Sequence, residues 1–331
     1  MDDLDQVDWA RLKHAYGPAT DVPAMLRELA GDGEASHAFD QLFTSLNHQG
    51  SVYSATSAAI PFLIRILEGG RRSELVHFLG SVAEAEDASI GLELGKGVRA
   101  LSRLLASEDP EERQSAARAL GAVTDHKGEA SQALRKAIEE ERDKNPRAAM
   151  TESLATLDEK SAPSRGASAR EQFCAARAMA RRERADISDK TLDQIAANWR
   201  VALEDEASDA GEMIVLGRGF PRAKQLQFYA ALLGETTVSF EAVTLARELL
   251  VVAFDDRRAW GSRGFFPQSL YCEFMKVRGK APAWEKPLNP DQRLAVAAIS
   301  KCDAIWEIAT NLWSLFNLPT NREGFADMLD A

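Results

Sequence analysis

The stretch VRALSRLLASEDPEERQSAARALGAV, Val98–Val123, decides the fold. Its first half places three leucines on one face of a helix, because residues three and four apart share a helical face. Ser-Glu-Asp-Pro at 107–110 then ends this helix and begins another, since proline suits a first helical turn, where its missing N–H has no partner to lose. The second helix gathers small and apolar residues on one face: Ala116, Ala117, Leu120 and Val123. The stretch therefore predicts two antiparallel helices that approach each other closely.

The same apolar pattern recurs upstream at offsets of 37–38 residues. The corresponding pairs are Leu26 and Leu29, Ile64 and Leu67, and Leu101 and Leu104. A weaker unit follows between Leu134 and Leu157. Each helix pair leaves an apolar face that only a neighbouring pair can bury. The repeats predict an all-α fold in which antiparallel helix pairs stack as an α-solenoid.

The unit from Leu101 to Val123 resembles a HEAT repeat. The matching features are a Leu-Leu pair, an Asp-Pro step, an arginine, an Ala-Ala pair and an Ala-Leu-Gly end, at Leu104-Leu105, Asp109-Pro110, Arg113, Ala116-Ala117 and Ala119-Leu120-Gly121. The resemblance implies a HEAT-like, right-handed α-solenoid. It also implies that Arg113 bridges successive turns by hydrogen bonding, as the arginine of HEAT repeats does.

Both ends of the chain are also similar to a group of bacterial HEAT-repeat proteins of unassigned activity. The N-terminal matches are Trp9, His14-Ala15-Tyr16-Gly17, Asp21-Val22-Pro23, Asn47-His48-Gln49-Gly50-Ser51-Val52-Tyr53, Ala55-Thr56 and Ala58-Ala59-Ile60-Pro61-Phe62-Leu63. The C-terminal matches are Gln292, Leu294, Trp306, Leu318-Pro319 and Arg322. This group carries no established catalytic motif, so the resemblance implies a fold and not a reaction.

The sequence changes character at EKSAPSRGASAR, Glu159–Arg170, which is rich in Ser, Ala and Gly and contains a proline. Such a composition is typical of a loop. We expect a HEAT-like repeat region over 1–158, a loop or linker over 159–170, and a helical C-terminal region over 171–331 that continues or caps the solenoid. The last region is expected to be more irregular, because five of the six Trp and ten of the 14 Phe follow residue 158.

The negative charge of the chain is concentrated in its first half. The net charge of the 331 residues is -11, and residues 1–157 hold 17 Lys and Arg against 26 Asp and Glu. An acidic surface repels phosphate backbones, so nucleic acid is disfavoured as a partner, whereas a basic protein is favoured. No apolar run is long enough to span a bilayer, and the N-terminus lacks the apolar core of a signal peptide. We therefore expect a cytoplasmic protein with no membrane partner.

No motif for catalysis or metal binding is visible. None of the five histidines is followed by Glu, and neither HExxH nor GxSxG occurs. Gly217-Arg218-Gly219 lacks the following Gly-Lys of a phosphate-binding loop. The three cysteines are few and widely spaced, which favours reduced, buried thiols. We expect no catalytic residues, no metal ligands and no cofactor.

The favoured function is therefore a non-catalytic, protein-binding scaffold, because solenoids expose long concave surfaces. This surface is expected to come from the second helices of the early repeats. Acidic residues predicted to line it are Glu111, Glu112, Glu129, Glu139, Glu140 and Glu141. A second candidate is the loop DDRRAWGSRGFFP at 255–267, since Arg and Trp are frequent binding hot spots. Its candidate residues are Arg257, Arg258, Trp260 and Arg263. The most specific form of this hypothesis is a cytoplasmic immunity-type inhibitor that grips a basic toxin.

Two alternatives stay open. His48-Gln49-Gly50 and Tyr53 lie in a turn between two repeats. Either they contact a ligand, or their role is structural, with His48 and Gln49 capping helix ends and Gly50 supplying a special backbone angle. The chain as a whole is alternatively an enzyme on a HEAT-like scaffold that acts on nucleic acid, like a DNA glycosylase. Such an enzyme needs aromatic rings for stacking and a carboxylate for the chemistry, and the 255–267 loop contains both.

Overall fold

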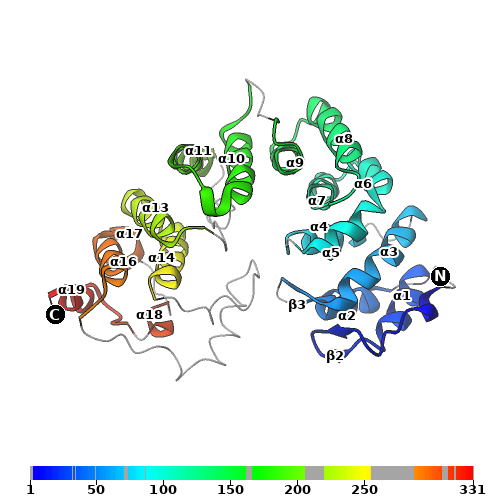
Figure 1. Cartoon of the computed structure of the whole chain (residues 1–331), viewed down its shortest axis with the longest axis horizontal. Coiled ribbons are helices and arrows are strands. Elements are labelled where there is room, and N and C mark those ends of the chain that lie inside the picture. The colour runs from blue at the N-terminus through cyan, green and yellow to red at the C-terminus, as the bar shows by residue number, and fades with distance from the viewer. Residues whose placement is uncertain are drawn as a thin grey trace. The chain divides into compact units, whose positions relative to one another are not determined.

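The computed structural model describes residues 3–31, 33, 35–48, 50–70, 74–85, 87–161, 166–205, 220–254, 287–307, 312–316 and 318–330. These residues are mostly helical, and the strands among them are only two residues long, which confirms the prediction of an all-α protein (Figure 1). The chain divides into two compact units, Met1–Met179 and Ala180–Ala331. The predicted linker at 159–170 precedes this division, and its residues 162–165 lie outside the described part.

The first unit contains ten helices among its described residues. They are α1 (Val22–Ala30), α2 (Ser36–Leu46), α3 (Ser54–Glu68), α4 (Glu74–Ala83), α5 (Ala88–Gly95), α6 (Val98–Leu104), α7 (Pro110–Gly121), α8 (Lys127–Glu140), α9 (Lys144–Leu157) and α10 (Ala169–Glu183), the last of which runs on into the second unit. The stretch at 98–123 forms α6 and α7, as predicted. The Asp109 carboxylate accepts a hydrogen bond from the Glu111 N–H and so caps α7, whose first residue is Pro110.

Two short hairpins lie between the first helices. Strands β1 (Lys13–His14) and β2 (Gly17–Pro18) pair antiparallel, as do β3 (Asn47–His48) and β4 (Ser51–Val52). A glycine with a positive φ lies at each reversal: Gly50, with φ 74°, stands in the β3–β4 turn, and Gly17, with φ 137°, is the first residue of β2, directly after the β1–β2 turn. Other residues adopt such angles at a steric cost, so the two glycines allow the chain to reverse within two residues.

Helices α4, α7 and α9 pack side by side at close range. A Cβ on Gly80 of α4 would lie 2.9 Å from the Ser115 Cα of α7, and a Cβ on Gly121 of α7 would lie 3.0 Å from the Ser153 Cα of α9. Farther along the first seam, Arg118 pairs with Glu84 at 3.4 Å. Residues later in one helix contact residues later in its neighbour, so neighbouring helices of this row run parallel. The intervening helices α6 and α8 pack against α7 and α9 and against each other.

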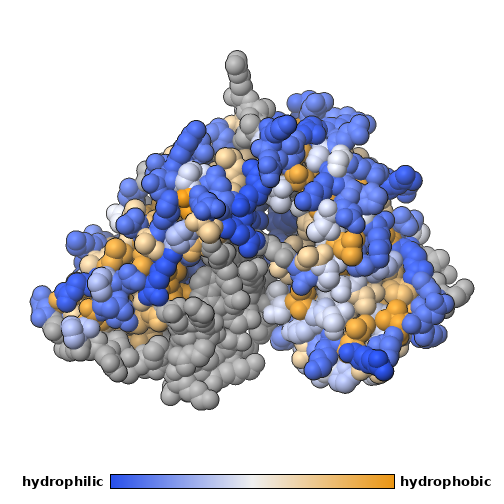
Figure 2. Space-filling model, viewed as in Figure 1, coloured by the Kyte–Doolittle hydropathy of each residue, from blue (hydrophilic) through white to orange (hydrophobic). Residues whose placement is uncertain are grey.

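Helix α10 extends the same row. Arg147 of α9 pairs with Glu171 at 2.9 Å, and Arg177 of α10 donates to Glu152 of α9 at 2.9 Å. One cluster of buried apolar residues runs from Leu4 to Leu154, and a smaller one joins Ala155 of α9 to Ala175 and Ala178 of α10. Figure 2 shows mainly hydrophilic residues on the outer surfaces of the helices, with apolar side chains in the seams. Apolar burial therefore holds this unit together, and ion pairs link its successive helices.

In the second unit, helices α13 (Arg222–Glu235), α14 (Ser239–Ala253) and α16 (Pro290–Lys301) pack together. The other helices described there are α11 (Asp189–Asp205), α17 (Asp303–Trp306), α18 (Leu312–Leu315) and α19 (Arg322–Asp330). Trp306, Trp313 and Phe325 form an aromatic cluster with ring centroids 5.1–5.3 Å apart. This core therefore uses the bulkier residues that the sequence placed in the second half.

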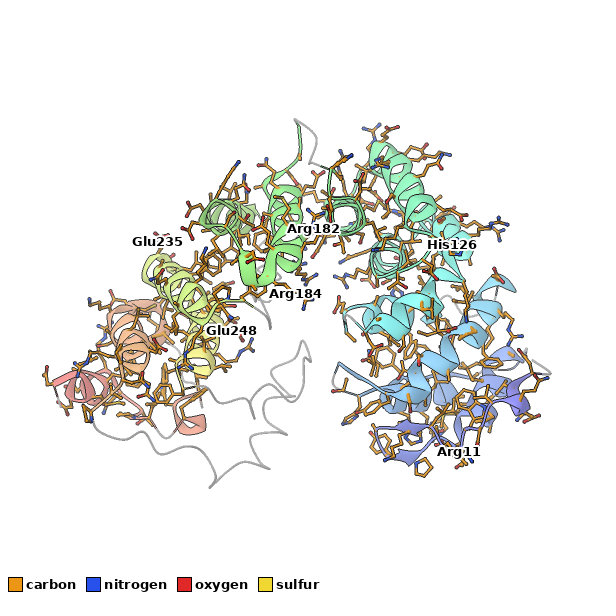
Figure 3. The ribbon with its side chains drawn as sticks, viewed as in Figure 1. Arg11, His126, Arg182, Arg184, Glu235 and Glu248 are labelled. Atoms are coloured by element: carbon orange, nitrogen blue, oxygen red, sulfur yellow. The ribbon has the colours of Figure 1, made fainter. Side chains whose placement is uncertain are left out.

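One buried acid interrupts the core of the second unit. Glu241, in the first turn of α14, is 1% exposed, and its Oε2 has no hydrogen-bond partner among the described residues. Burial raises the pKa of this carboxyl, because the charged form loses its hydration. The same helix carries Glu248, which pairs with the adjacent Arg247 at 2.7 Å (Figure 3).

Candidate functional site

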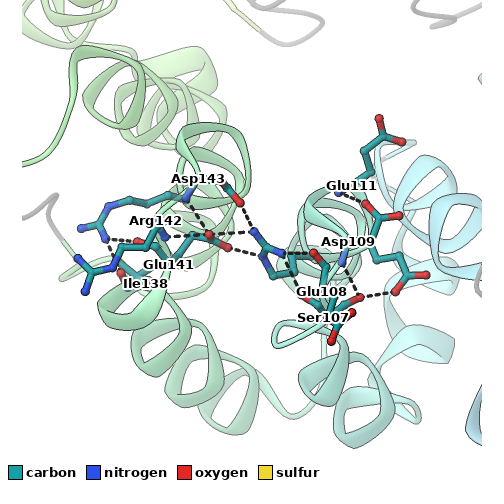
Figure 4. A network of polar contacts seen from close by, with 11 residues as sticks. Ser107, Glu108, Asp109, Glu111, Ile138, Glu141, Arg142 and Asp143 are labelled. Carbon is teal, nitrogen blue, oxygen red and sulfur yellow. Dashed lines mark hydrogen bonds and ion pairs between the residues drawn. The ribbon is translucent and has the colours of Figure 1, made fainter.

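The best-defined polar site of the first unit surrounds Arg113, the fourth residue of α7 (Figure 4). Its Nη1 donates to the carbonyl oxygens of Ser107 and Glu108 at 2.9 and 3.1 Å, in the turn before α7. Its Nε and Nη2 donate to the two carboxylate oxygens of Glu141 at 2.6 and 3.1 Å, and Nη2 also contacts Asp143. One guanidinium thus joins the α6–α7 turn to the α8–α9 turn, so Arg113 has the bridging role expected from the sequence.

The Arg113–Glu141 pair is buried and fully hydrogen-bonded. The side chains are 12% and 4% exposed, and Glu141 also accepts the backbone N–H groups of Arg142 and Asp143 at 2.9 Å. Burial alone would raise the pKa of Glu141, but the hydrogen bonds from Arg113 and from the two N–H groups outweigh it and hold the pKa below its usual range. The hydrogen bonds to Glu141 raise the pKa of Arg113.

Arg147 repeats this arrangement 34 residues later in the chain. It is the fourth residue of α9, and it donates to the carbonyl oxygen of Ile138, near the end of α8, at 2.5 Å and to that of Glu141, in the turn before α9, at 3.2 Å. It also donates to Glu171 of α10 at 2.9 Å. Arg113 and Arg147 therefore occupy equivalent positions in successive helix pairs, each bound to the turn behind it and to a carboxylate ahead of it.

Four of the six glutamates predicted to line a binding surface flank this network. Of the other two, Glu141 is buried in the ion pair and Glu129 lies in the first turn of α8. Glu111 and Glu112 lie in the first turn of α7, and Glu139 and Glu140 end α8. Glu112 accepts a hydrogen bond from the Ser107 hydroxyl at 2.5 Å, and the other three are exposed. The Arg113–Glu141 contact brings the two pairs to one edge of the unit. We define the acidic edge as Glu108, Asp109, Glu111, Glu112, Glu139, Glu140 and Asp143.

The placement of the four glutamates differs from the expected one in a single respect. The sequence assigned them to the second helices of the repeats, but Glu139 and Glu140 lie on α8, the first helix of its pair, and all four lie at helix ends. Acidic side chains in a first turn, such as Glu111 and Glu112, also interact favourably with the helix dipole. Their part in binding stays a prediction.

His48 lies in the second hairpin, and Tyr53 directly follows it. The Tyr16 hydroxyl is 3.3 Å from His48 Nδ1, and the two rings meet edge-on with centroids 5.4 Å apart. Tyr53 precedes α3, and its N–H donates to the Thr56 hydroxyl at 2.9 Å. Burial raises the pKa of the Tyr53 phenol, and the neighbouring Tyr16 phenol adds to the rise. Tyr16 is not among the predicted binding residues, although the sequence motif His14-Ala15-Tyr16-Gly17 contains it.

Some predicted binding residues lie outside the described part of the chain, and other expectations concern metal sites, membrane helices and cysteines within it. Arg257, Arg258, Trp260 and Arg263 belong to the undescribed segment 255–286. The described residues include no group of three His, Cys, Asp or Glu side chains that could hold a metal ion. Within the same residues, no helix has the length and apolar character needed to cross a membrane. Cys174 and Cys302 are buried.

Comparison with known proteins leaves these geometric observations as the basis for function. No family model, curated protein or solved structure matches the chain.

Proposed function

We propose that the chain is a non-catalytic protein-binding scaffold, built as a HEAT-like right-handed α-solenoid, whose acidic edge binds a basic protein. The repeated setting of Arg113 and Arg147 is the observation that supports this architecture most strongly. The parallel row α4, α7, α9 and α10 supports it as well, because repeat units stacked in one direction place equivalent helices side by side.

The electrostatics of the acidic edge favour a basic partner. Glu111, Glu139 and Glu140 are exposed, and the buried Arg113 and Glu141 charges beside them neutralise each other. The buried ion pair therefore does little to reduce the negative potential of the exposed carboxylates. The exposed Arg142, in the α8–α9 turn, and Lys144, at the start of α9, offset part of this negative charge. Complementary charge accelerates the encounter of two proteins and selects against partners of like charge. The buried ion pair fixes the turns that carry these glutamates, so these turns lose little conformational entropy on binding.

The most specific form of the proposal is a cytoplasmic immunity-type inhibitor of bacterial origin, which blocks a basic toxin by covering its active site. In that form the partner is a toxic protein whose activity stops at a one-to-one ratio with this chain. A basic partner whose activity is unchanged by the complex would restrict the proposal to scaffolding.

The test uses the full chain as bait in extracts of its source cells, followed by identification and purification of the captured protein. The association rate is then measured between 50 and 300 mM salt for the wild type and for a variant with Glu111→Gln, Glu112→Gln, Glu139→Gln and Glu140→Gln. We expect the variant to associate about tenfold more slowly at low salt and to lose most of the salt dependence, because surface charge acts chiefly on association.

A matched control removes four exposed acids of the second unit, through Asp193→Asn, Glu323→Gln, Asp327→Asn and Asp330→Asn. It changes the net charge by the same amount, and its association rate should stay within twofold of the wild type. Capture of no specific basic protein, or an equal effect of both variants, would show the proposed function to be wrong.

A further inference from the structure

The segment that forms the second hairpin carries no charge, although the adjoining first hairpin holds the exposed Lys13. Residues 41–64 contain no Asp, Glu, Lys or Arg, although such residues make up 27% of the chain. This segment forms the end of α2, the β3–β4 hairpin and most of α3. His48, Ser51, Val52 and Tyr53 of the segment are partly exposed. In Figure 2 this end of the first unit is paler than the blue surfaces of the helices.

Tyr16 of the first hairpin joins this uncharged segment. It is 66% exposed, yet its hydroxyl and its ring both contact His48. Arg11, a nearby charged residue in the chain, is directed to solvent and pairs with Asp8 at 3.0 Å (Figure 3). We define the hairpin surface as Tyr16, His48, Ser51, Val52 and Tyr53.

The backbone that carries Tyr16 is fixed from beneath. The Tyr16 N–H donates to His14 Nδ1 at 3.0 Å, so the proton of this imidazole lies on Nε2, which donates to Asp21 at 2.9 Å. His14 is buried. The Ala15 N–H donates to the Ser45 carbonyl oxygen at 3.0 Å, which ties the first hairpin to the end of α2. Tyr16 is therefore an exposed aromatic side chain on an immobilised turn.

We propose that the hairpin surface is the contact that determines how long the protein partner stays bound, with Tyr16 as its hot spot. This inference rests on the proposed function. The centres of protein interfaces are depleted in charge and enriched in tyrosine, whereas charged groups occupy the rim. A side chain ordered before binding loses little entropy when it is buried, which lengthens the lifetime of a complex.

The chemistry of the surface indicates what the partner presents to it. Two phenols, an imidazole and a serine hydroxyl offer neutral donors and acceptors, which match the amide groups of a polypeptide loop. The partner is thus a protein that is basic where it meets the acidic edge and uncharged where it meets Tyr16. The two surfaces have different kinetic roles: the acidic edge sets the association rate, and the hairpin surface sets the dissociation rate.

The test measures association and dissociation rates of the purified captured partner with Tyr16→Ala, the acidic-edge variant and the control Leu92→Ala, which trims an exposed apolar side chain of α5. We expect Tyr16→Ala to raise the dissociation rate at least tenfold and to leave the association rate and its salt dependence unchanged. Leu92→Ala should match the wild type. His48→Ala provides a second variant of the same surface if Tyr16→Ala melts at a lower temperature than the wild type.

The outcomes separate the two proposals. If the acidic-edge variant associates slowly while Tyr16→Ala and His48→Ala dissociate within twofold of the wild type, the hairpin inference is wrong and the proposed function stands. If the acidic-edge variant associates like the wild type at every salt concentration, the proposed function is wrong, whatever Tyr16→Ala does. If Tyr16→Ala changes association but not dissociation, the division of roles is overturned.

Discussion

Glu141 in the first unit and Glu241 in the second are both buried carboxyl groups, but their surroundings differ. Glu141 receives the Arg113 guanidinium and two backbone N–H groups, and its pKa is lowered. Glu241 has an Oε2 without a partner among the described residues, and its pKa is raised. Burial acts on both in the same direction, so the donors around each group decide the sign of the shift. Folding therefore favours the charged form of Glu141 and disfavours the charged form of Glu241.

The largest expected effect comes from removing the guanidinium beside Glu141. Arg113→Met leaves a buried carboxylate without its counter-charge, and breaking such a pair costs about 3–5 kcal/mol. We expect the first unit to lose about this free energy of unfolding in urea at pH 7. The exposed neighbour Arg142 is the control, because Arg142→Met changes the same charge outside the ion pair and should stay within about 0.5 kcal/mol. Equal effects of the two substitutions would show that the Arg113 network contributes no specific stability.

Glu141→Gln should have a smaller effect that depends on pH. The folded-state pKa of Glu141 lies below its unfolded value, so the stability that the charge contributes is present above the unfolded pKa and is lost as the pH falls through the folded one. Replacing the charged hydrogen bonds should cost about 1.5–3 kcal/mol at pH 7. Urea unfolding at pH 7 and in acid measures the difference, which should shrink in acid. A penalty that is the same at both pH values would contradict the assignment.

Glu241→Gln should reverse the sign of the effect. The folded-state pKa of Glu241 lies above its unfolded value, so its contribution is fully present below the unfolded pKa and is lost as the pH rises through the folded one. The wild-type second unit should therefore lose stability as the pH rises, and the amide should remove this loss and gain on the order of 1 kcal/mol at pH 8. Thermal unfolding from pH 4 to 8 checks the prediction. A variant less stable than the wild type at pH 8 would mean that the carboxylate is paired.

The sequence predicted what depends on local pattern. Leucines and alanines at helical spacing and the Asp109-Pro110 step identified α6 and α7, and the HEAT-like motif identified the bridging role of Arg113. The carboxylate that Arg113 binds lies 28 residues away, and no periodicity marks a contact of that separation. The position of the four acidic-edge glutamates at helix ends likewise depends on how the helix pairs stack.

Two other features depended on tertiary contacts that the sequence does not display. Strands of two residues carry no alternating pattern, so the hairpins that present Tyr16 and His48 could not be recognised from periodicity. Glu241 stands in the first turn of a helix, where an acid is usual and normally exposed. Its burial follows from the packing around α14, which composition alone does not reveal.

The most direct test of protein binding through the first unit is hydrogen–deuterium exchange of the full chain, alone and with the purified captured partner. We predict that the partner slows exchange at 107–113 and 139–143, which carry the acidic edge, and at 14–18 and 47–53, which carry the hairpin surface. Slower exchange confined to the second unit, with these segments unchanged, would contradict it.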